Sequence, residues 1–262
     1  MSNCRKYGPA PFTIAVLHGG PGAPGSMAPV ARELAHQWGV VEPLQTEKSL
    51  EGQVQELRSV LENRGAPPVT LIGSSWGAML GFILTARYPA LVKKLILVGS
   101  AVYEKEYASG IFETRLQRLR PPEKEELLAL IKQLDESNNR SKNKLFAQIG
   151  KLIDKADHYD PITLDTEIIE TQYELHRRVW SEAEELRSSG KLLERGKAIK
   201  CPVLAIHGDY DPHPSEGVRE PLASVLEKFR FILLDKCGHL PWLETHARKK
   251  FFALVARELE SD

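Results

Sequence analysis

This 262-residue sequence lacks a charge of one sign, long apolar runs and an even set of cysteines. Its 35 basic and 35 acidic side chains cancel, so no net field recruits nucleic acid or an anionic membrane. The apolar runs all fall well short of the roughly 20 residues that cross a bilayer. We therefore expect no nucleic-acid partner and no membrane partner.

Cysteine occurs only at Cys4, Cys201 and Cys237. An odd number without metal-type spacing indicates free thiols in a reducing compartment, which predicts a cytoplasmic protein. We expect Cys201 and Cys237 to act as small apolar residues of the core. Near the start, Arg5-Lys6 precedes a short apolar stretch, as in a signal peptide. That stretch runs directly into a motif that we assign below to the active site, so we do not expect it to be cleaved.

Short apolar segments alternate with helical patterns at both ends of the chain. This order favours parallel strands with helices on both faces, so the predicted fold class is α/β with a doubly wound, mostly parallel sheet. The expected strands are 12–17, 69–72, 95–98, 203–206 and 231–234. The expected helices are 26–38 with Ser26 as N-cap, 50–61 with Gly65 as the stop, 76–88 and 246–259.

The middle of the chain breaks this alternation. Between about 102 and 200 we find no convincing strand, and helical patterns at 122–134 and 168–186 are separated by a polar loop at 136–143. We predict one core built from residues 1–101 and 201–262, with residues 102–200 inserted into it as a helical cap.

The sharpest motif is Gly73-Ser74-Ser75-Trp76-Gly77, a G-x-S-x-G sequence. An apolar strand precedes it and an apolar helix follows, which is the context of a tight turn that raises a serine hydroxyl above the sheet. Glycines two residues before and after the serine relieve crowding in such a turn. Ser75 is therefore our candidate nucleophile; a glycine-rich turn without catalysis is the simpler alternative.

Among the eight histidines, His239 follows the last predicted strand and so lies at the same sheet edge as Ser75. Its ordinary pKa near 6.5 suits a group that takes a proton and returns it. We interpret His36, His158, His176 and His246 as solvent-exposed. We expect His18 to shape its own loop.

The base needs a carboxylate to orient it. The segment after the penultimate strand offers Asp209 and Asp211, in the chain order Ser, Asp, His that this kind of site uses. We favour Asp211, three residues after Gly208, and keep Asp209 as the alternative.

The same segment holds a possible metal site. Residues His207, Asp209, Asp211 and His213 alternate, and alternation in an extended chain puts side chains on one side. Hydrolytic metal sites usually draw their ligands from separate elements, and Pro212 disfavours a regular strand. We therefore expect no metal and no cofactor.

A glycine-rich loop, His18-Gly19-Gly20-Pro21-Gly22, follows the first predicted strand. Glycine lets backbone N–H groups approach a developing oxyanion. We predict that Gly20 and Trp76, the residue after the nucleophile, supply the oxyanion N–H groups. A phosphate-binding loop is disfavoured, because no G-K-[ST] follows.

These motifs together resemble the α/β-hydrolase superfamily from about residue 12 onward. The loop at 18–22 with Ser75-Trp76-Gly77 resembles the proline iminopeptidase branch, although esterases and carbon–carbon bond hydrolases also carry such loops. The resemblance implies Ser75, Asp211 and His239 as a triad and cap carboxylates that hold a substrate amine. Acidic stretches at 167–174 and 182–185 are candidates for the latter. Only about eleven residues precede the first predicted strand, where the family usually has a longer strand pair.

The function predicted from these residues is a serine hydrolase that cleaves a small ester, amide or short peptide through an acyl-enzyme. The alternatives are a carboxylesterase or carbon–carbon bond hydrolase, a metal hydrolase built on 207–213, and a non-catalytic binding module on the same fold. A module of that kind would be expected to have lost a triad member, and none is lost. Ser75 argues against relatives that use a carboxylate nucleophile. The oligomeric state cannot be predicted from the sequence.

Overall fold

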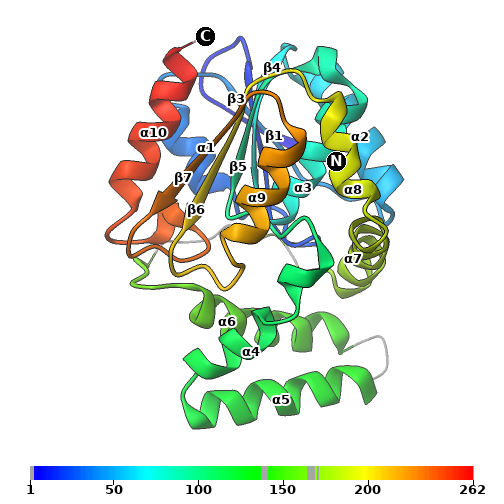
Figure 1. Cartoon of the computed structure of the whole chain (residues 1–262), viewed down its shortest axis with the longest axis vertical. Coiled ribbons are helices and arrows are strands. Elements are labelled where there is room, and N and C mark those ends of the chain that lie inside the picture. The colour runs from blue at the N-terminus through cyan, green and yellow to red at the C-terminus, as the bar shows by residue number, and fades with distance from the viewer. Residues whose placement is uncertain (1–2, 137–140, 164–168, 170, 262) are drawn as a thin grey trace.

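A single sheet forms the centre of the molecule (Figure 1). The computed structural model describes residues 3–136, 141–163, 169 and 171–261. Within these, the strands follow the spatial order β1-β3-β2-β4-β5-β6-β7, and all neighbours are parallel except β1 and β3. The bounds are Cys4–Tyr7 (β1), Ile14–Leu17 (β2), Val40–Pro43 (β3), Val69–Ser74 (β4), Val92–Val98 (β5), Val203–Gly208 (β6) and Phe229–Leu234 (β7). The predicted α/β class is confirmed.

Helices cover both faces of the sheet (Figure 1). One face packs against α1 (Ala28–Leu34) and α10 (Arg248–Glu260), the other against α2 (Leu50–Arg64), α3 (Trp76–Arg87) and α9 (Glu216–Val225). Neighbouring strand residues feed opposite cores: Ala15 and Leu17 join the cluster with α2 and α3, whereas Ile14 and Val16 join the one with α1 and α10. Because both faces are buried, central strands such as β2 and β6 are continuous apolar runs in the sequence.

Each predicted helix is present, but several bounds differ: the helix expected at 26–38 spans Ala28–Leu34, and the one expected at 168–186 spans Tyr173–Ser188. Helix α2 begins at an N-cap, Ser49, whose hydroxyl accepts a hydrogen bond from the Gly52 N–H at 3.0 Å. Ser26 was the expected cap of α1, but the helix begins after Met27 and no side chain caps it, so that prediction is wrong. Pro29 sits in the first turn, where a missing N–H costs nothing, and this fixes the start of α1.

Two strands were not predicted. Strand β1 pairs antiparallel with β3 at the edge of the sheet, and both are only four residues long. Glu42 in β3 is completely buried, and its partners come from β1: the Tyr7 hydroxyl donates to it at 2.7 Å and Arg5 lies 3.7 Å away. Burial of a carboxylate is tolerated only with such partners, and Tyr7 and Arg5 are distant from Glu42 in the sequence. The apolar pattern alone therefore did not reveal these strands.

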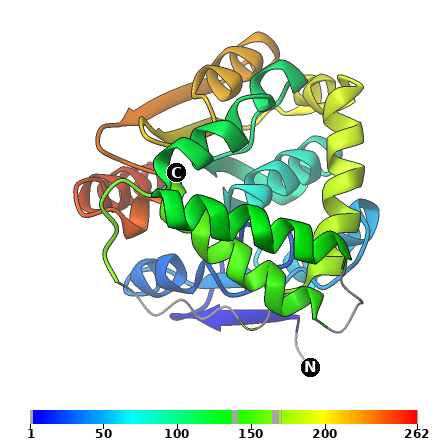
Figure 2. The same ribbon diagram turned by 90° about the horizontal axis from the view of Figure 1, so that it is seen from below.

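All described helices between β5 and β6 belong to the inserted segment. They are α4 (Ile111–Arg118), α5 (Pro121–Glu136), α6 (Lys142–Asp157), α7 (Tyr173–Ser188) and α8 (Lys191–Glu194). The first three share a small apolar cluster and lie beyond the carboxyl ends of the strands (Figures 1 and 2). In contrast, α7 and α8 pack into the core cluster of the sheet through Leu175, Val179 and Leu192. Residues 137–140 of the expected loop lie outside the described residues, and the division at 102 and 200 stays a prediction.

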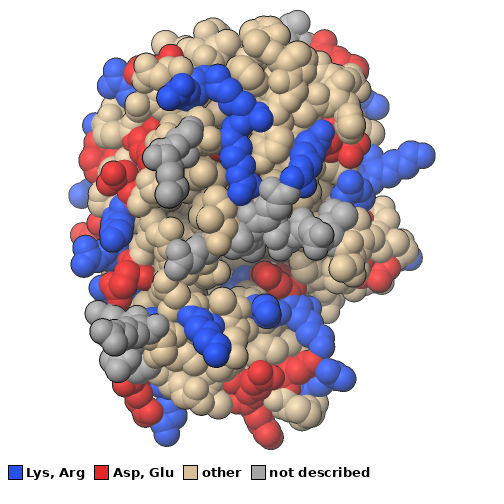
Figure 3. Space-filling model, turned by 180° about the vertical axis from the view of Figure 1, so that it is seen from behind, with Lys and Arg blue, Asp and Glu red and all other residues tan. Residues whose placement is uncertain are grey.

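The surface carries no dominant charge on the face shown in Figure 3, where basic and acidic groups are interspersed over both the sheet domain and the inserted helices. Among the described residues, no helix combines the length and apolar character needed to cross a membrane.

Candidate active site

Ser75 occupies the turn between β4 and α3. Its backbone is strained, with φ 53° and ψ −116°, and its N–H donates to Val98 O at 3.0 Å. A side chain at Gly73 would collide with Gly77 O, and one at Gly77 would lie 2.7 Å from His18 O. The two glycines of the motif are therefore required by close backbone contacts, as the sequence pattern predicted.

His239 and Asp211 come from the loops that follow β7 and β6. The His239 Nδ1–H donates to Asp211 Oδ2 at 2.7 Å, and both side chains are buried. The alternative carboxylate, Asp209, is exposed and instead accepts the Cys237 N–H at 3.0 Å. The structure thus pairs Asp211, and not Asp209, with the imidazole.

Gly99, at the end of β5, brings the serine turn and the histidine together. Its φ of 49° lies in the left-handed region, and a Cβ there would lie 3.2 Å from His239 Nδ1 and 3.4 Å from Asp211 Oδ2. The preceding residue, Val98, accepts the Ser75 N–H. Ser75 and the His239–Asp211 pair therefore converge at the carboxyl edge of β5.

Burial and charge act in opposite directions on this pair. Burial on its own raises the pKa of Asp211, but the neighbouring histidines, His239 first, hold it well below its ordinary value. Burial lowers the pKa of His239, but the Asp211 carboxylate outweighs that effect and the net pKa is raised. The arrangement therefore keeps the acid ionised and strengthens the base.

The glycine-rich loop after β2 lies directly beside the serine. A Cβ on Gly19 would sit 3.3 Å from Ser75 Cβ and 3.9 Å from Ser75 Oγ, whereas the role of Gly20 as an oxyanion donor stays a prediction. Gly20 has a φ of 115° and precedes a cis bond to Pro21. His18 is completely buried, with its ring nitrogens 2.7 Å from Gly19 O and 3.0 Å from Leu44 O, in agreement with a role in shaping the loop.

Trp76, the other predicted oxyanion donor, is the first residue of α3. The helix itself leaves the N–H groups of its first turn unpaired, so the Trp76 N–H is free to face an anion. Its indole is completely buried and donates to Gln53 Oε1 at 2.9 Å, which fixes the side chain.

The inserted segment contacts the glycine-rich loop through residues before and within α7. The Gln172 N–H donates to Gly22 O and the His176 Nδ1–H to Pro21 O, each at 3.0 Å. The His176 ring also stacks against Trp180, with centroids 6.2 Å apart. His176 is partly buried, so the prediction that this histidine is solvent-exposed is wrong, and burial lowers its pKa.

The end of α6 contacts the His239 loop in a similar way. Asp157 O accepts the His239 N–H at 2.9 Å, and the Asp157 carboxylate is held by Arg115 at 2.6 and 2.7 Å. Completely buried Glu244 accepts the Gly238 N–H and the His158 Nδ1–H, each at 3.0 Å. The prediction that His158 is solvent-exposed is therefore also wrong. The sequence did not reveal this contact, because Glu244 is distant from His158 along the chain.

The alternating histidines and aspartates after β6 do not form the one-sided row that a metal site there would need. Asp209 points away, whereas Asp211 Oδ1 accepts the His213 Nδ1–H at 2.7 Å and the His213 N–H at 2.9 Å. Within the described parts of the chain, the group whose spacing could hold a metal ion is Asp211, His213 and His239. In this structure both histidines are hydrogen-bonded to Asp211, and their rings stack against each other.

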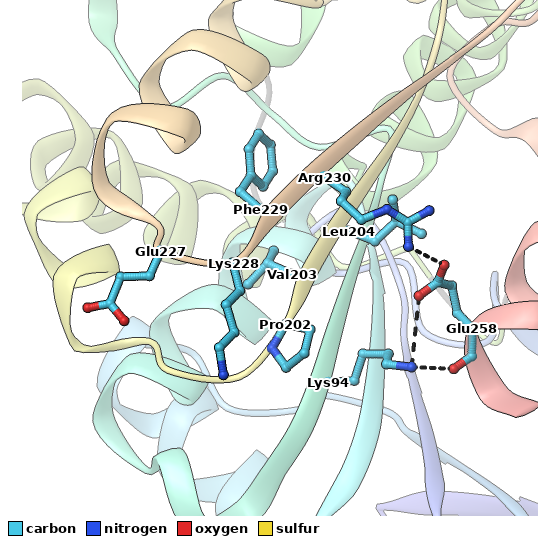
Figure 4. A pocket seen from close by; sticks show the side chains of 9 residues that line it. All are labelled: Lys94, Pro202, Val203, Leu204, Glu227, Lys228, Phe229, Arg230 and Glu258. Carbon is cyan, nitrogen blue, oxygen red and sulfur yellow. Dashed lines mark hydrogen bonds and ion pairs between the residues drawn. The ribbon is translucent and has the colours of Figure 1, made fainter. Parts of the chain in front are cut away.

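A surface pocket of about 230 Å³ lies elsewhere (Figure 4). It opens at the amino ends of β6 and β7, which is the sheet edge opposite Ser75. Its cations are largely neutralised, because Glu258 lies 2.7 Å from Arg230 and 3.8 Å from Lys94. This pocket is not part of the candidate active site.

Comparison with known proteins identifies the fold family. Residues 46–245 match the model of the alpha/beta hydrolase fold family, so the chain belongs to the α/β-hydrolase family of enzymes. No curated protein matches the sequence. The solved structures with a similar fold include VinJ, at 19% identity and a TM-score of 0.67, with 98% of this chain and 94% of that one covered.

Two further solved structures with a similar fold belong to a peptidase and a serine hydrolase. Proline iminopeptidase from Mycobacterium smegmatis shares 19% identity at a TM-score of 0.64, with 98% of this chain and 94% of that one covered. A serine hydrolase involved in carbazole degradation, the CarC enzyme, shares 18% at a TM-score of 0.61, with 98% and 93% covered. At these identities the likeness concerns the fold.

Proposed function

We propose that this protein is a serine hydrolase that cleaves a small ester or amide through an acyl-enzyme, with Ser75 as nucleophile, His239 as base and Asp211 as the orienting acid. The observation that carries the proposal is the convergence, at the end of β5, of a strained serine turn and a buried His–Asp pair joined by a 2.7 Å hydrogen bond. The family to which the chain belongs is consistent with it.

In the proposed first half-reaction, Ser75 Oγ attacks the substrate carbonyl carbon and its proton passes to His239 Nε2. The N–H groups of Gly20 and Trp76 hold the resulting oxyanion. The intermediate collapses, and His239 gives its proton to the leaving alcohol or amine, which leaves an acyl ester on Ser75.

In the second half-reaction, His239 takes a proton from water, and the hydroxide attacks the acyl carbonyl. Collapse releases the carboxylic acid, and His239 returns the proton to Ser75. Asp211 stays ionised throughout and stabilises the imidazolium. Its lowered pKa and the raised pKa of His239 support these roles.

For the substrate, we favour an esterase-type reaction over an aminopeptidase of the proline iminopeptidase type. A peptidase needs a carboxylate facing the site to hold the substrate ammonium. In the acidic stretches proposed for that role, Glu174 is paired with Arg177 at 3.1 Å and Glu182 accepts the Leu50 N–H at 2.8 Å. Residues 167, 168 and 170 lie outside the described residues. Carbon–carbon bond hydrolysis remains the second candidate, since the same loop and triad serve it.

Steady-state kinetics with nitrophenyl esters test the proposed reaction. Ser75→Ala should lower kcat by about 10⁴-fold or more with the fold intact, and Ser74→Ala is the matched control. A proline anilide and its N-acetylated form test the substrate class: a strong preference for the free amine would indicate an iminopeptidase, and equal or no cleavage of both would support the esterase-type reaction.

We also propose a cytoplasmic protein that acts on a small molecule or short peptide, without nucleic-acid or membrane partners. The three cysteines are free; Cys237 is completely buried and Cys201 is partly buried against the core, as expected. Alkylation of the protein in freshly lysed cells, followed by mass spectrometry, should label all three thiols after denaturation. A disulfide between any two would contradict the reducing compartment.

A further inference from the structure

Asp211 is bound by a second histidine that the proposed mechanism does not use. His213 lies two residues after Asp211, in the loop that follows β6, and its side chain is 10% exposed. Each oxygen of Asp211 has its own imidazole: Oδ1 accepts the Nδ1–H of His213 and Oδ2 the Nδ1–H of His239, both at 2.7 Å.

Two imidazoles on opposite oxygens fix the plane of the carboxylate. Without the His213 ring, Oδ1 would keep only a backbone donor on the same loop, and the carboxylate could rotate about its Cβ–Cγ bond more freely and lose alignment with the His239 ring. The His213 backbone N–H adds a second bond to Oδ1 at 2.9 Å. The turn is held in place from the sheet, because His207 in β6 donates its Nε2–H to His213 O at 2.8 Å.

The two histidine rings also contact each other. Their centroids are 4.8 Å apart and the planes meet at 27°, so the His213 ring lies along one side of the His239 ring. This contact restricts rotation of His239 away from Asp211, which a base that must stay aligned with Ser75 requires.

The pKa values of the two histidines are shifted in opposite directions. Burial lowers the pKa of His213 despite its bond to Asp211, whereas the pKa of His239 is raised. The other charged or titratable groups that act on the three side chains are His207, Asp154, Asp157 and Arg115. His213 therefore stays neutral and donates its Nδ1–H, while the proton from the nucleophile is taken by His239.

We propose that His213 is a positioning residue of the active site, whose ring N–H holds the Asp211 carboxylate in the orientation that His239 needs. The proposal rests on the proposed serine hydrolase function and adds a fourth side chain to its machinery.

A matched pair of variants separates the hydrogen bond from the bulk of the ring. The side-chain nitrogen of Asn lies near the position of histidine Nδ1, and that of Gln near Nε2. His213→Asn therefore keeps a donor for Asp211 and His213→Gln moves it away, although both lose the ring contact and both stay polar. His36→Gln, at an exposed histidine, is the control for handling.

His213→Gln should lower kcat for a nitrophenyl ester by about 10- to 100-fold with little change in KM, the loss typical of a misaligned catalytic group. The acidic limb of its kcat/KM profile should move to lower pH. A carboxylate that rotates out of line with His239 stabilises the imidazolium less, which lowers the pKa of the base. His213→Asn should stay within about threefold of the wild type, with its acidic limb unmoved.

Equal losses in both variants, or wild-type kcat and acidic limb in His213→Gln, would overturn the proposal. A purely structural role would lower the thermal midpoint of both variants without moving the acidic limb. A wild-type protein that neither hydrolyses esters nor reacts with a fluorophosphonate would instead show that the proposed function is wrong. Failure of that function is thereby separated from failure of the role of His213.

Discussion

Ser75 has a positive φ, which costs a residue with a side chain on the order of 1–3 kcal/mol. The strain is sustained because the N–H of Ser75 is bonded to the end of β5 and glycines at 73 and 77 remove the clashes around it. A strained, partly exposed serine near a buried His–Asp pair is the arrangement expected of a preorganised nucleophile rather than of a simple turn.

At the same scale, the two aspartates after β6 make different contacts and should respond differently to amidation. Asp211→Asn removes the acceptor that fixes the His239 tautomer, so kcat should fall by about 10⁴-fold. Asp209→Asn keeps an oxygen for the Cys237 N–H and should cost less than about tenfold. Kinetics on both variants check this, and the opposite ranking would transfer the acid role to Asp209.

The pH dependence follows from His239, which must be neutral to accept the Ser75 proton. Because its pKa is raised above the ordinary 6.5 by Asp211, against the effect of burial, activity should be lost as the pH falls through a value above 6.5. The measurement is kcat/KM for an ester between pH 5 and 9. An acidic limb with its midpoint below 6.5 would contradict the described His239–Asp211 geometry.

The residues that could be predicted from the sequence differ in one physical respect from those that could not. Ser75 and His239 could be predicted because each belongs to a short local pattern beside an apolar strand. His213 was noticed only as a possible metal ligand, and Glu244 was not noticed at all. Their partners are side chains or N–H groups whose proximity depends on the completed fold, so no local pattern marks them.

At the scale of elements, helices between β5 and β6 contact two loops of the candidate site. One contact joins α7 to the glycine-rich loop through His176, and another joins the end of α6 to the His239 loop through Asp157. These helices therefore help to position the loops of the candidate site. Their helical character was predictable from periodicity, but these contacts were not, because they mostly use backbone groups.

His176→Phe tests the first of these contacts. Phenylalanine keeps a ring beside Trp180 but removes the donor to Pro21 O, so the glycine-rich loop loses one of its anchors. We expect kcat to fall about tenfold, less than the 10²- to 10³-fold loss of an oxyanion donor itself, with a parallel loss of affinity for a boronate analogue. His36→Phe is the control, and unchanged kcat and boronate affinity in His176→Phe would refute the role.

The strands that were missed belong to the same scale. The five predicted strands contain apolar runs, and all but the edge strand β7 are central, whereas β1 is a charged edge strand of sequence Cys-Arg-Lys-Tyr. Charged residues suit an exposed edge, because they oppose pairing with another chain. The same charged residues leave β1 without an apolar run, which is the pattern by which the other strands were predicted.

At the scale of the whole molecule, the proposed chemistry generates its nucleophile with a base and needs no Lewis acid. Esterase activity should therefore survive exhaustive dialysis against EDTA. Activity that is lost on dialysis and restored by zinc or manganese would show that Asp211, His213 and His239 hold a metal instead of forming the proposed hydrogen-bonded group.

Covalent labelling with a fluorophosphonate shows directly whether Ser75 is the nucleophile. Wild-type protein is treated with a fluorophosphonate, its intact mass is measured, and the adduct is located by peptide sequencing in the mass spectrometer. We expect one adduct per chain, on Ser75, which is present in Ser74→Ala and absent in Ser75→Ala. An adduct on any other serine, or a folded wild-type protein that takes up no label, would contradict it.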